Sequence, residues 1–173
     1  MDTALKAKIK KIKVLVMDVD GVLTDGRIIV DGRGQEIKNF DVQDGFGIVM
    51  FRKAGYKTAI ITARSSPPTE FRAQDLKIDQ VYQNAYPKME FYKRLLVEFN
   101  VSDEEVCYIG DDLPDLKVIR QAGFAVTVPD GHDEIKRAAD YVTQKSGGRG
   151  AVREVVELIL KAQGRWEDVL AGQ

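Results

Sequence analysis

The sequence predicts an α/β protein built on a doubly wound, Rossmann-like parallel sheet with helices on both faces. Short apolar runs typical of buried strands alternate along the chain with stretches of helical length, which indicates a parallel sheet. Three of these strands end in polar residues, at the edge where such sheets bind ligands. A chain of 173 residues is long enough for one domain with a sizeable core and too short for two. We therefore treat residues 1–173 as a single domain.

The first predicted strand is an uninterrupted apolar run, Val14–Met17, that stops at Asp18 and Asp20. Such a run is typical of a strand buried on both faces. Because strand side chains alternate, Asp18 and Asp20 point to the same side. Two carboxylates at the end of a buried strand are costly unless the lost hydration is offset. The pattern therefore predicts a divalent cation between them, or a proton on one of them.

A β-hairpin is predicted over about residues 27–40, because Asp31-Gly32 separates two apolar stretches. An isolated two-stranded hairpin is only marginally stable. We therefore expect its apolar side chains to pack against another copy of the chain. These side chains are Ile28, Val30, Ile37 and Phe40.

Helices and strands alternate in the rest of the chain, and a short amphipathic helix carrying Leu5 and Ile9 precedes the first strand. Strands are predicted at 58–62, 81–82, 106–109, 124–128 and 141–143. Helices are predicted at 45–53 (capped by Asp44), 66–76, 88–99, 113–123, 134–139 and 151–162. The glycines at 147–150 predict a flexible break within a C-terminal arm over about 145–173, which ends in a tail from Trp166.

Composition excludes several classes of function. A net charge of −1 provides no global field for nucleic acid or a membrane surface. No apolar run approaches the roughly 20 residues of a membrane span, and the amino terminus lacks the apolar segment of a secretory signal. Cys107 and His132 are the only residues of their types, which argues against a disulfide framework, a His/Cys zinc site and a Ser-His-Asp triad. We expect a cytoplasmic protein.

The polar residues at the strand ends form a set suited to phosphoryl transfer: Asp18, Asp20, Thr62, Lys88, Asp111 and Asp112. Carboxylate oxygens suit Mg²⁺, which binds through few protein ligands together with substrate phosphate. A lysine and a hydroxyl remain to hold phosphate oxygens. One aspartate can attack phosphorus, and another can protonate the leaving oxygen and later deprotonate water.

In this order the motifs resemble the haloacid dehalogenase superfamily of phosphatases over essentially the whole chain. The motifs are Asp18-x-Asp20-Gly, a strand ending in Thr62, Lys88, and Gly110-Asp-Asp112 with Asp115. The resemblance implies Asp18 as nucleophile, Asp20 as acid/base, and Thr62 and Lys88 as phosphoryl ligands. It further implies Mg²⁺ held by Asp18, the Asp20 backbone carbonyl and Asp111, with Asp112 and Asp115 as partners of the metal and the lysine.

The stretch between the first motif and Thr62 holds only a hairpin and a helix, so the resemblance is to the subclass without a cap domain. Within it the chain looks like the 3-deoxy-D-manno-octulosonate 8-phosphate phosphatase family. The matching segments are 19–26, 44–48, 61–64, 110–113 and 147–154. This likeness implies hydrolysis of that sugar acid phosphate in lipopolysaccharide precursor synthesis. It also implies a homotetramer in which hairpins meet centrally and the glycine-rich arm reaches a neighbouring active site.

The same likeness implies substrate contacts at Asp20, Asp41, Val42, Gln43, Asp44, Gly45, Arg64, Arg72, Lys88 and Arg149. The chain departs from the family's usual residues at Asp41, Gln43, Val49 and Ala63. Two cationic groups are thereby missing near the sugar, which leaves the preference between eight-carbon and nine-carbon sugar acids open. A phosphatase for a nonulosonate 9-phosphate is the nearest alternative.

Two other classes are weaker interpretations of the same residues. Phosphoacceptor receiver domains also use clustered Asp, Thr and Lys, but they place the phosphoacceptor after the third strand, whereas the Asp-x-Asp motif here follows the first. A catalytically inactive scaffold would have no need of the intact acidic set. Replacing Asp18 with Asn distinguishes the enzyme from the scaffold, because in an enzyme it should abolish turnover while leaving folding and assembly intact.

Overall fold

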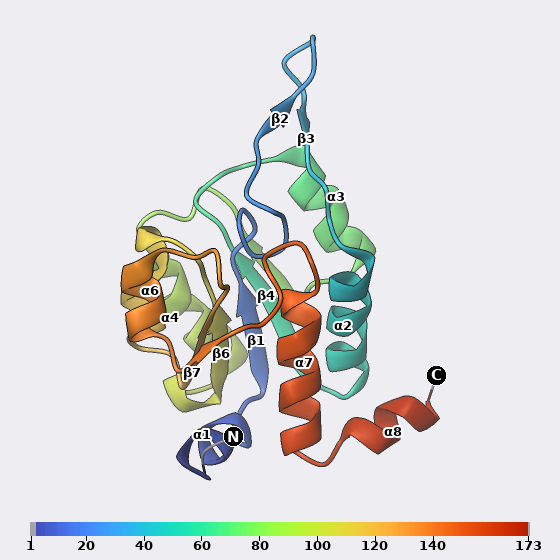
Figure 1. The fold of residues 1–173 in the computed structure, drawn as a ribbon, viewed down its shortest axis with the longest axis vertical. Coiled ribbons are helices and arrows are strands. Elements are labelled where there is room, and N and C mark those ends of the chain that lie inside the picture. Colours follow the sequence, from blue (N-terminus) through green and yellow to red (C-terminus); the bar gives the residue numbers. More distant parts are fainter. Residues whose placement is uncertain (1–2, 173) are drawn as a thin grey trace.

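The central sheet of the computed structural model, which describes residues 3–172, has six parallel strands in the order β5-β4-β1-β6-β7-β8 (Figure 1). The strands are β1 (Val14–Met17), β4 (Lys57–Ile61), β5 (Gln80–Tyr82), β6 (Val106–Ile109), β7 (Phe124–Thr127) and β8 (Tyr141–Val142). The predicted doubly wound sheet is confirmed. From β1 the chain builds the sheet first on the β4 side and then on the β6 side, so the topological switch point lies beside β1.

Helices cover both faces of the sheet (Figure 1). One face carries α2 (Val42–Lys53), α3 (Pro67–Asp75) and α7 (Ala151–Ala162), with α1 (Thr3–Ile9) and α8 (Trp166–Ala171) at its lower end. The other carries α4 (Lys88–Phe99), α5 (Leu116–Ile119) and α6 (Asp133–Ala138). Short 3₁₀ turns lie at Asp103–Glu105 and Leu113–Asp115.

The strands are apolar throughout because each of them contributes to two cores. Within β1, Leu15 and Met17 belong to the cluster under α2 and α7, whereas Val14 and Val16 belong to the cluster under α4 and α5. This alternation is the period of an extended strand, and all four side chains are fully buried. Both cores therefore hold β1 rigidly, which fixes the direction of the residues that follow it.

The predicted hairpin is present as β2 (Ile29–Val30) and β3 (Glu36–Ile37), and it projects from the end of the molecule where the strands terminate (Figure 1). The Asp31 carboxylate accepts hydrogen bonds from the backbone N–H groups of Arg33 and Gln35, both at 2.8 Å, which closes the loop. Four apolar side chains on the hairpin are 42–57% exposed: Ile28, Ile29, Val30 and Ile37. Phe40 differs from the prediction, because it packs against the core of its own chain.

The predicted cap of α2 is wrong by one helical turn. Asp41, and not Asp44, is the N-cap, and its carboxylate accepts from the N–H groups of Gln43 (2.6 Å) and Asp44 (3.1 Å). The Asp44 carboxylate instead accepts from the N–H groups of Gly150 (3.1 Å) and Arg153 (2.8 Å). Asp44, which lies on α2, thus caps the start of the neighbouring helix α7. Burial raises the pKa of the Asp44 carboxyl to about 6.

The segment predicted as a C-terminal arm is packed against its own chain. Gly148 N–H donates to the Val22 carbonyl at 2.9 Å, and a Cβ on Gly147 would lie 1.8 Å from the Gly21 carbonyl oxygen. The apolar face of α7 is fully buried, and the expected tail forms α8, with Gln173 outside the described residues. None of the helices within residues 3–172 combines the length and apolar character needed to cross a membrane.

Candidate active site

A cavity of about 240 Å³ lies at the carboxyl ends of β1, β4 and β6, beside the topological switch point. It is lined by Asp18, Asp20, Gly26, Thr62, Ala63, Arg64, Lys88, Asp111, Asp112, Pro114 and Asp115. The structure thus brings together all the side chains for which the sequence predicts catalytic, metal-binding or metal-supporting roles. They meet because parallel strands end at one edge, so residues after different strands become neighbours.

Lys88, the first residue of α4, links two of the acids. Its Nζ lies 2.7 Å from Asp18 Oδ2 and 2.6 Å from Asp115 Oδ1, and its side chain is almost fully buried. The other Asp18 oxygen, Oδ1, accepts from the Val19 N–H at 2.7 Å. Both Asp18 oxygens are therefore held in fixed directions at the floor of the cavity.

Asp115 has both carboxylate oxygens engaged by the protein. Oδ1 accepts from Lys88 and from the Tyr108 hydroxyl, both at 2.6 Å. Oδ2 accepts from the backbone N–H groups of Asp111 (3.1 Å) and Asp112 (3.2 Å). Asp115 is fully buried and orients both Lys88 and the loop that carries Asp111. The Asp112 carboxylate caps the 3₁₀ turn that follows, accepting from Leu113 N–H at 2.8 Å.

The cluster holds more negative than positive charge. One carboxylate oxygen each of Asp18, Asp111 and Asp115 lies within 4.8 Å of the others, and these carboxylates face the single ammonium of Lys88. Burial, reinforced by the charge of Asp115, raises the pKa of Asp18 to about 7. Burial and the charge of Asp18 raise the pKa of Asp111 to about 8. Burial alone would lower the pKa of Lys88, but Asp18 and Asp115 outweigh it and raise that pKa.

This donor set fits a divalent cation. Asp111 Oδ1 is buried and accepts no hydrogen bond from any group in residues 3–172. The Asp111 side chain lies directly on Gly21, where an added Cβ would be 2.0 Å from Oδ2, and Gly21 has a φ of +90°. Free carboxylate oxygens in excess of the local positive charge are the ligands that Mg²⁺ prefers. Asp111 can supply a free oxygen, and each Asp18 oxygen has one protein contact, whereas each Asp115 oxygen already accepts two hydrogen bonds.

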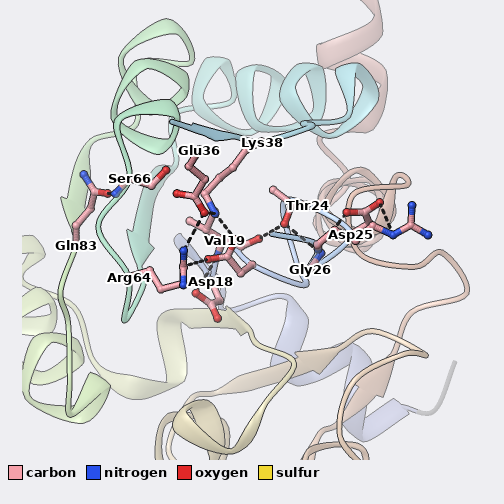
Figure 2. A network of polar contacts seen from close by, with 12 residues as sticks. Asp18, Val19, Thr24, Asp25, Gly26, Glu36, Lys38, Arg64, Ser66 and Gln83 are labelled. Carbon is pink, nitrogen blue, oxygen red and sulfur yellow. Dashed lines mark hydrogen bonds and ion pairs between the residues drawn. The ribbon is translucent and has the colours of Figure 1, made fainter. Parts of the chain in front are cut away.

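Two charged residues of the site, Glu36 and Lys38, were not predicted. They come from the base of the hairpin, and Figure 2 shows them reaching toward Arg64 beside Asp18. Lys38 pairs with Asp20 and Glu36, and Arg64 pairs with the same two acids. The alternation Glu36-Ile37-Lys38 places two charges on one face of a strand, but no sequence signal directs that face toward Asp20.

Most of the predicted sugar contacts lie outside the cavity of their own chain. Asp41, Val42, Gln43, Asp44, Gly45, Arg72 and Arg149 do not line it. Arg72 instead pairs with Asp75 at 2.7 Å and packs on Gly45, where a Cβ would lie 2.1 Å from its Nη2. Arg149 is exposed, with Nη2 3.8 Å from Asp25 Oδ2. The start of α2 is held by α3 and α7, which keeps these residues off the strand ends.

Replacing Lys88 with Met is expected to destabilise the metal-free protein by about 3–5 kcal/mol, because it leaves the buried Asp18 and Asp115 carboxylates without their cation. Urea unfolding followed by circular dichroism measures this difference. Lys93→Met, on the exposed side of the same helix, is the matched control and should stay within about 0.5 kcal/mol of wild type. Equal stability of the two variants would contradict the role of Lys88 in the cluster.

Comparison with known proteins identifies the family. The family of haloacid dehalogenase-like hydrolases matches residues 77–155. The 3-deoxy-D-manno-octulosonate 8-phosphate phosphatase of Escherichia coli K12 is 43% identical over 162 residues, covering 94% of this chain and 86% of the relative. That of Yersinia pestis is 45% identical over 156 residues, covering 90% of this chain and 83% of the relative.

Solved structures agree with this result. The 3-deoxy-D-manno-octulosonate 8-phosphate phosphatase of Moraxella catarrhalis, in complex with a magnesium ion, a phosphate ion and a KDO molecule, has a TM-score of 0.96 at 44% identity and covers 99% of both chains. The cobalt-bound Haemophilus influenzae enzyme has a TM-score of 0.88 at 39% identity, covering 91% of this chain and 92% of that one. This chain therefore belongs to the 3-deoxy-D-manno-octulosonate 8-phosphate phosphatase family of haloacid dehalogenase-like hydrolases.

Proposed function

We propose that the protein is a Mg²⁺-dependent phosphomonoesterase that hydrolyses 3-deoxy-D-manno-octulosonate 8-phosphate to the sugar acid and phosphate, a step of lipopolysaccharide precursor synthesis. The observation that carries the proposal is the buried cluster of Asp18, Lys88 and Asp111, which has excess negative charge and an unshared carboxylate oxygen. The 43% identity with a phosphatase of that name supports the choice of substrate.

Asp18 is the proposed nucleophile. With Oδ1 held by the Val19 N–H and Oδ2 by Lys88, its carboxylate has a fixed direction of attack on the phosphorus of the substrate. The P–O bond to the sugar breaks as the bond to Asp18 forms, giving an aspartyl-phosphate. The Lys88 ammonium and the Thr62 hydroxyl, at the edge of the same cavity, would hold phosphoryl oxygens. Mg²⁺, held by Asp18, the Asp20 carbonyl and Asp111, would neutralise phosphoryl charge.

Asp20 is the proposed acid/base. In the first step it gives a proton to the sugar oxygen as that oxygen leaves phosphorus. In the second step it takes a proton from the water that attacks the aspartyl-phosphate, which releases phosphate and restores Asp18. Asp112 and Asp115 keep the loop of Asp111 and the Lys88 ammonium in place.

Phosphate release from a panel of esters, with and without Mg²⁺, tests this function. The panel holds the octulosonate 8-phosphate, a nonulosonate 9-phosphate and hexose 6-phosphates. We expect Mg²⁺-dependent release, with kcat/KM for the octulosonate at least about 10-fold above the others. Preference for the nonulosonate would favour the second candidate, because the departures at Asp41, Gln43, Val49 and Ala63 leave the preference between the two sugar acids open. Absence of release from every ester, with the protein folded, would favour the inactive scaffold.

We also propose that the protein is a cytoplasmic homotetramer whose hairpins meet. The support is the apolar hairpin surface, which nothing covers within residues 3–172 of the single chain. In such an assembly a neighbour could bring the exposed residues Val42, Gln43 or Arg149 to the cavity. Cell fractionation tests the location.

Ile29→Asp is expected to shift the solution mass from a tetramer to smaller species, because it places a charge on the apolar hairpin surface. Light scattering at micromolar concentration measures the mass. Val97→Asp is the matched control, since Val97 is 81% exposed on α4, away from the hairpin. A monomeric wild-type protein would contradict the proposal, as would an Ile29→Asp variant that remains a tetramer.

A further inference from the structure

The base of the hairpin lies against the active site, where Lys38 contacts Asp20. Glu36 lies in β3 and Lys38 directly follows it, so the two side chains share one face of the strand. The Lys38 side chain is only 1% exposed and that of Glu36 14%, although the apolar hairpin residues beside them face solvent. Figure 2 shows both heads directed at Arg64, next to Asp18.

Lys38, Glu36, Arg64 and Asp20 form a closed ring of charges. Lys38 Nζ donates to Asp20 Oδ1 and lies 3.3 Å from Glu36 Oε1. Arg64 Nη2 donates to the same Glu36 oxygen at 2.9 Å, and Arg64 Nε lies 3.5 Å from Asp20 Oδ2. Burial would raise the pKa of Glu36, but the neighbouring Ser66, Arg64 and Lys38 side chains outweigh it and lower that pKa. Glu36 is therefore the anion that holds both cations against Asp20.

The two oxygens of Asp20 differ in their surroundings. Oδ1 is bonded to Lys38, whereas Oδ2 is buried and accepts no hydrogen bond from the described part of the chain, residues 3–172. A carboxylate that transfers a proton must keep one oxygen free and aimed at the reacting atom. The short contact with Lys38 occupies Oδ1, so Oδ2, which has the longer ion pair with Arg64 Nε at 3.5 Å and accepts no hydrogen bond within residues 3–172, is left as that oxygen.

We propose that Lys38 is a positioning residue for the reaction: it holds Asp20 by Oδ1 so that Oδ2 gives its proton to the departing sugar oxygen. The inference rests on the proposed function and extends it to a residue of the hairpin. Glu36 supports Lys38 and Arg64. An apolar side chain would fill the site of Lys38 without the desolvation cost of a buried ammonium, so the charge is best explained by its contact with Asp20.

Dependence on the leaving group tests this role. A sugar or other alkyl phosphate needs a proton on its leaving oxygen, but the phenolate of p-nitrophenyl phosphate leaves without one. We compare kcat/KM, which reports the steps up to aspartyl-phosphate formation. Lys38→Met should lower kcat/KM for the alkyl ester by about 10²-fold and for the aryl ester by less than about 3-fold. Lys38→Arg should recover part of the alkyl activity, because it restores a cation beside Oδ1.

Two further comparisons make the test specific. Arg33→Met, at the exposed loop of the hairpin, should leave both substrates unaffected. Adding Lys38→Met to Asp20→Asn should cost little more than Asp20→Asn alone, because both changes remove the same proton transfer. Equal losses on the two esters, or additive losses in the double variant, would overturn the role of Lys38. A wild-type protein inactive on every ester would instead contradict the proposed function itself.

Discussion

Asp18→Asn is expected to lower kcat for phosphate release by at least about 10⁴-fold, because a carboxamide cannot form the aspartyl-phosphate. The variant should remain folded, since Asn has the shape of Asp and Lys88 keeps its contact with Asp115. In the metal-free protein at pH 8 it should even gain stability, because it removes one of the crowded buried carboxylates. Phosphate release and urea unfolding of the same preparation measure both effects.

Asp130→Asn is the matched control for this change, since Asp130 is an exposed aspartate outside the cavity. Its kcat should stay within about 2-fold of wild type, because surface substitutions away from such sites have small effects. Retained turnover in Asp18→Asn would contradict the assignment of the nucleophile, and an unfolded variant would show that Asp18 is needed for the fold.

The metal-free protein is expected to lose stability as pH rises from about 5 to 8, by an amount on the order of a few kcal/mol. Asp18 and Asp111 have folded-state pKa values of about 7 and about 8, well above those of an unfolded chain. At pH values between the unfolded-state pKa of an aspartate and these folded-state pKa values, the native state binds more protons than the unfolded state. Stability therefore falls as the pH rises through this range. The loss from these two groups is complete only once the pH lies well above the folded-state pKa of Asp111, about 8. Thermal unfolding in a metal chelator across this range measures the slope.

Added Mg²⁺ should reverse this loss, so the increase in Tm at a fixed Mg²⁺ concentration should be larger at pH 8 than at pH 6. At pH 6 the cation must displace protons from Asp18 and Asp111, which weakens its binding. Asp111→Asn should make the metal-free protein more stable at pH 8 and abolish most of the Mg²⁺ effect. A Mg²⁺ effect independent of pH, or unchanged in Asp111→Asn, would contradict the proposed cation site.

The position of the acidic cluster can be predicted from sequence because it depends on two local facts. The runs Val14–Met17 and Val106–Ile109 are apolar enough to be buried strands, and each stops just before an aspartate or a Gly-Asp pair. In a parallel sheet the carboxyl ends share one edge, so these acids become neighbours without further information. Lys88 begins α4 and does not end a strand, so its contacts with Asp18 and Asp115 depend also on the loop between β5 and α4.

The residues that the sequence does not reveal depend on tertiary packing. Asp41 and Asp44 are equally good N-cap residues, and the approach of α7 to α2 engages Asp44 elsewhere. Glu36 and Lys38 read as solvent-facing charges on a small hairpin, and only the direction in which the hairpin leaves β1 brings them to Asp20. The segment 166–171 is short, yet it forms α8 because Val169 and Trp166 pack against the core.

Chemical trapping of the covalent intermediate tests the proposed mechanism most directly. The enzyme is acid-quenched during turnover of a phosphate ester with Mg²⁺, reduced with borohydride, and digested for mass spectrometry of its peptides. Reduction converts an aspartyl-phosphate to homoserine, so we expect homoserine at position 18, dependent on substrate and absent from Asp18→Asn. Homoserine at Asp20 or Asp111, or none at position 18 during rapid turnover, would contradict Asp18 as the nucleophile.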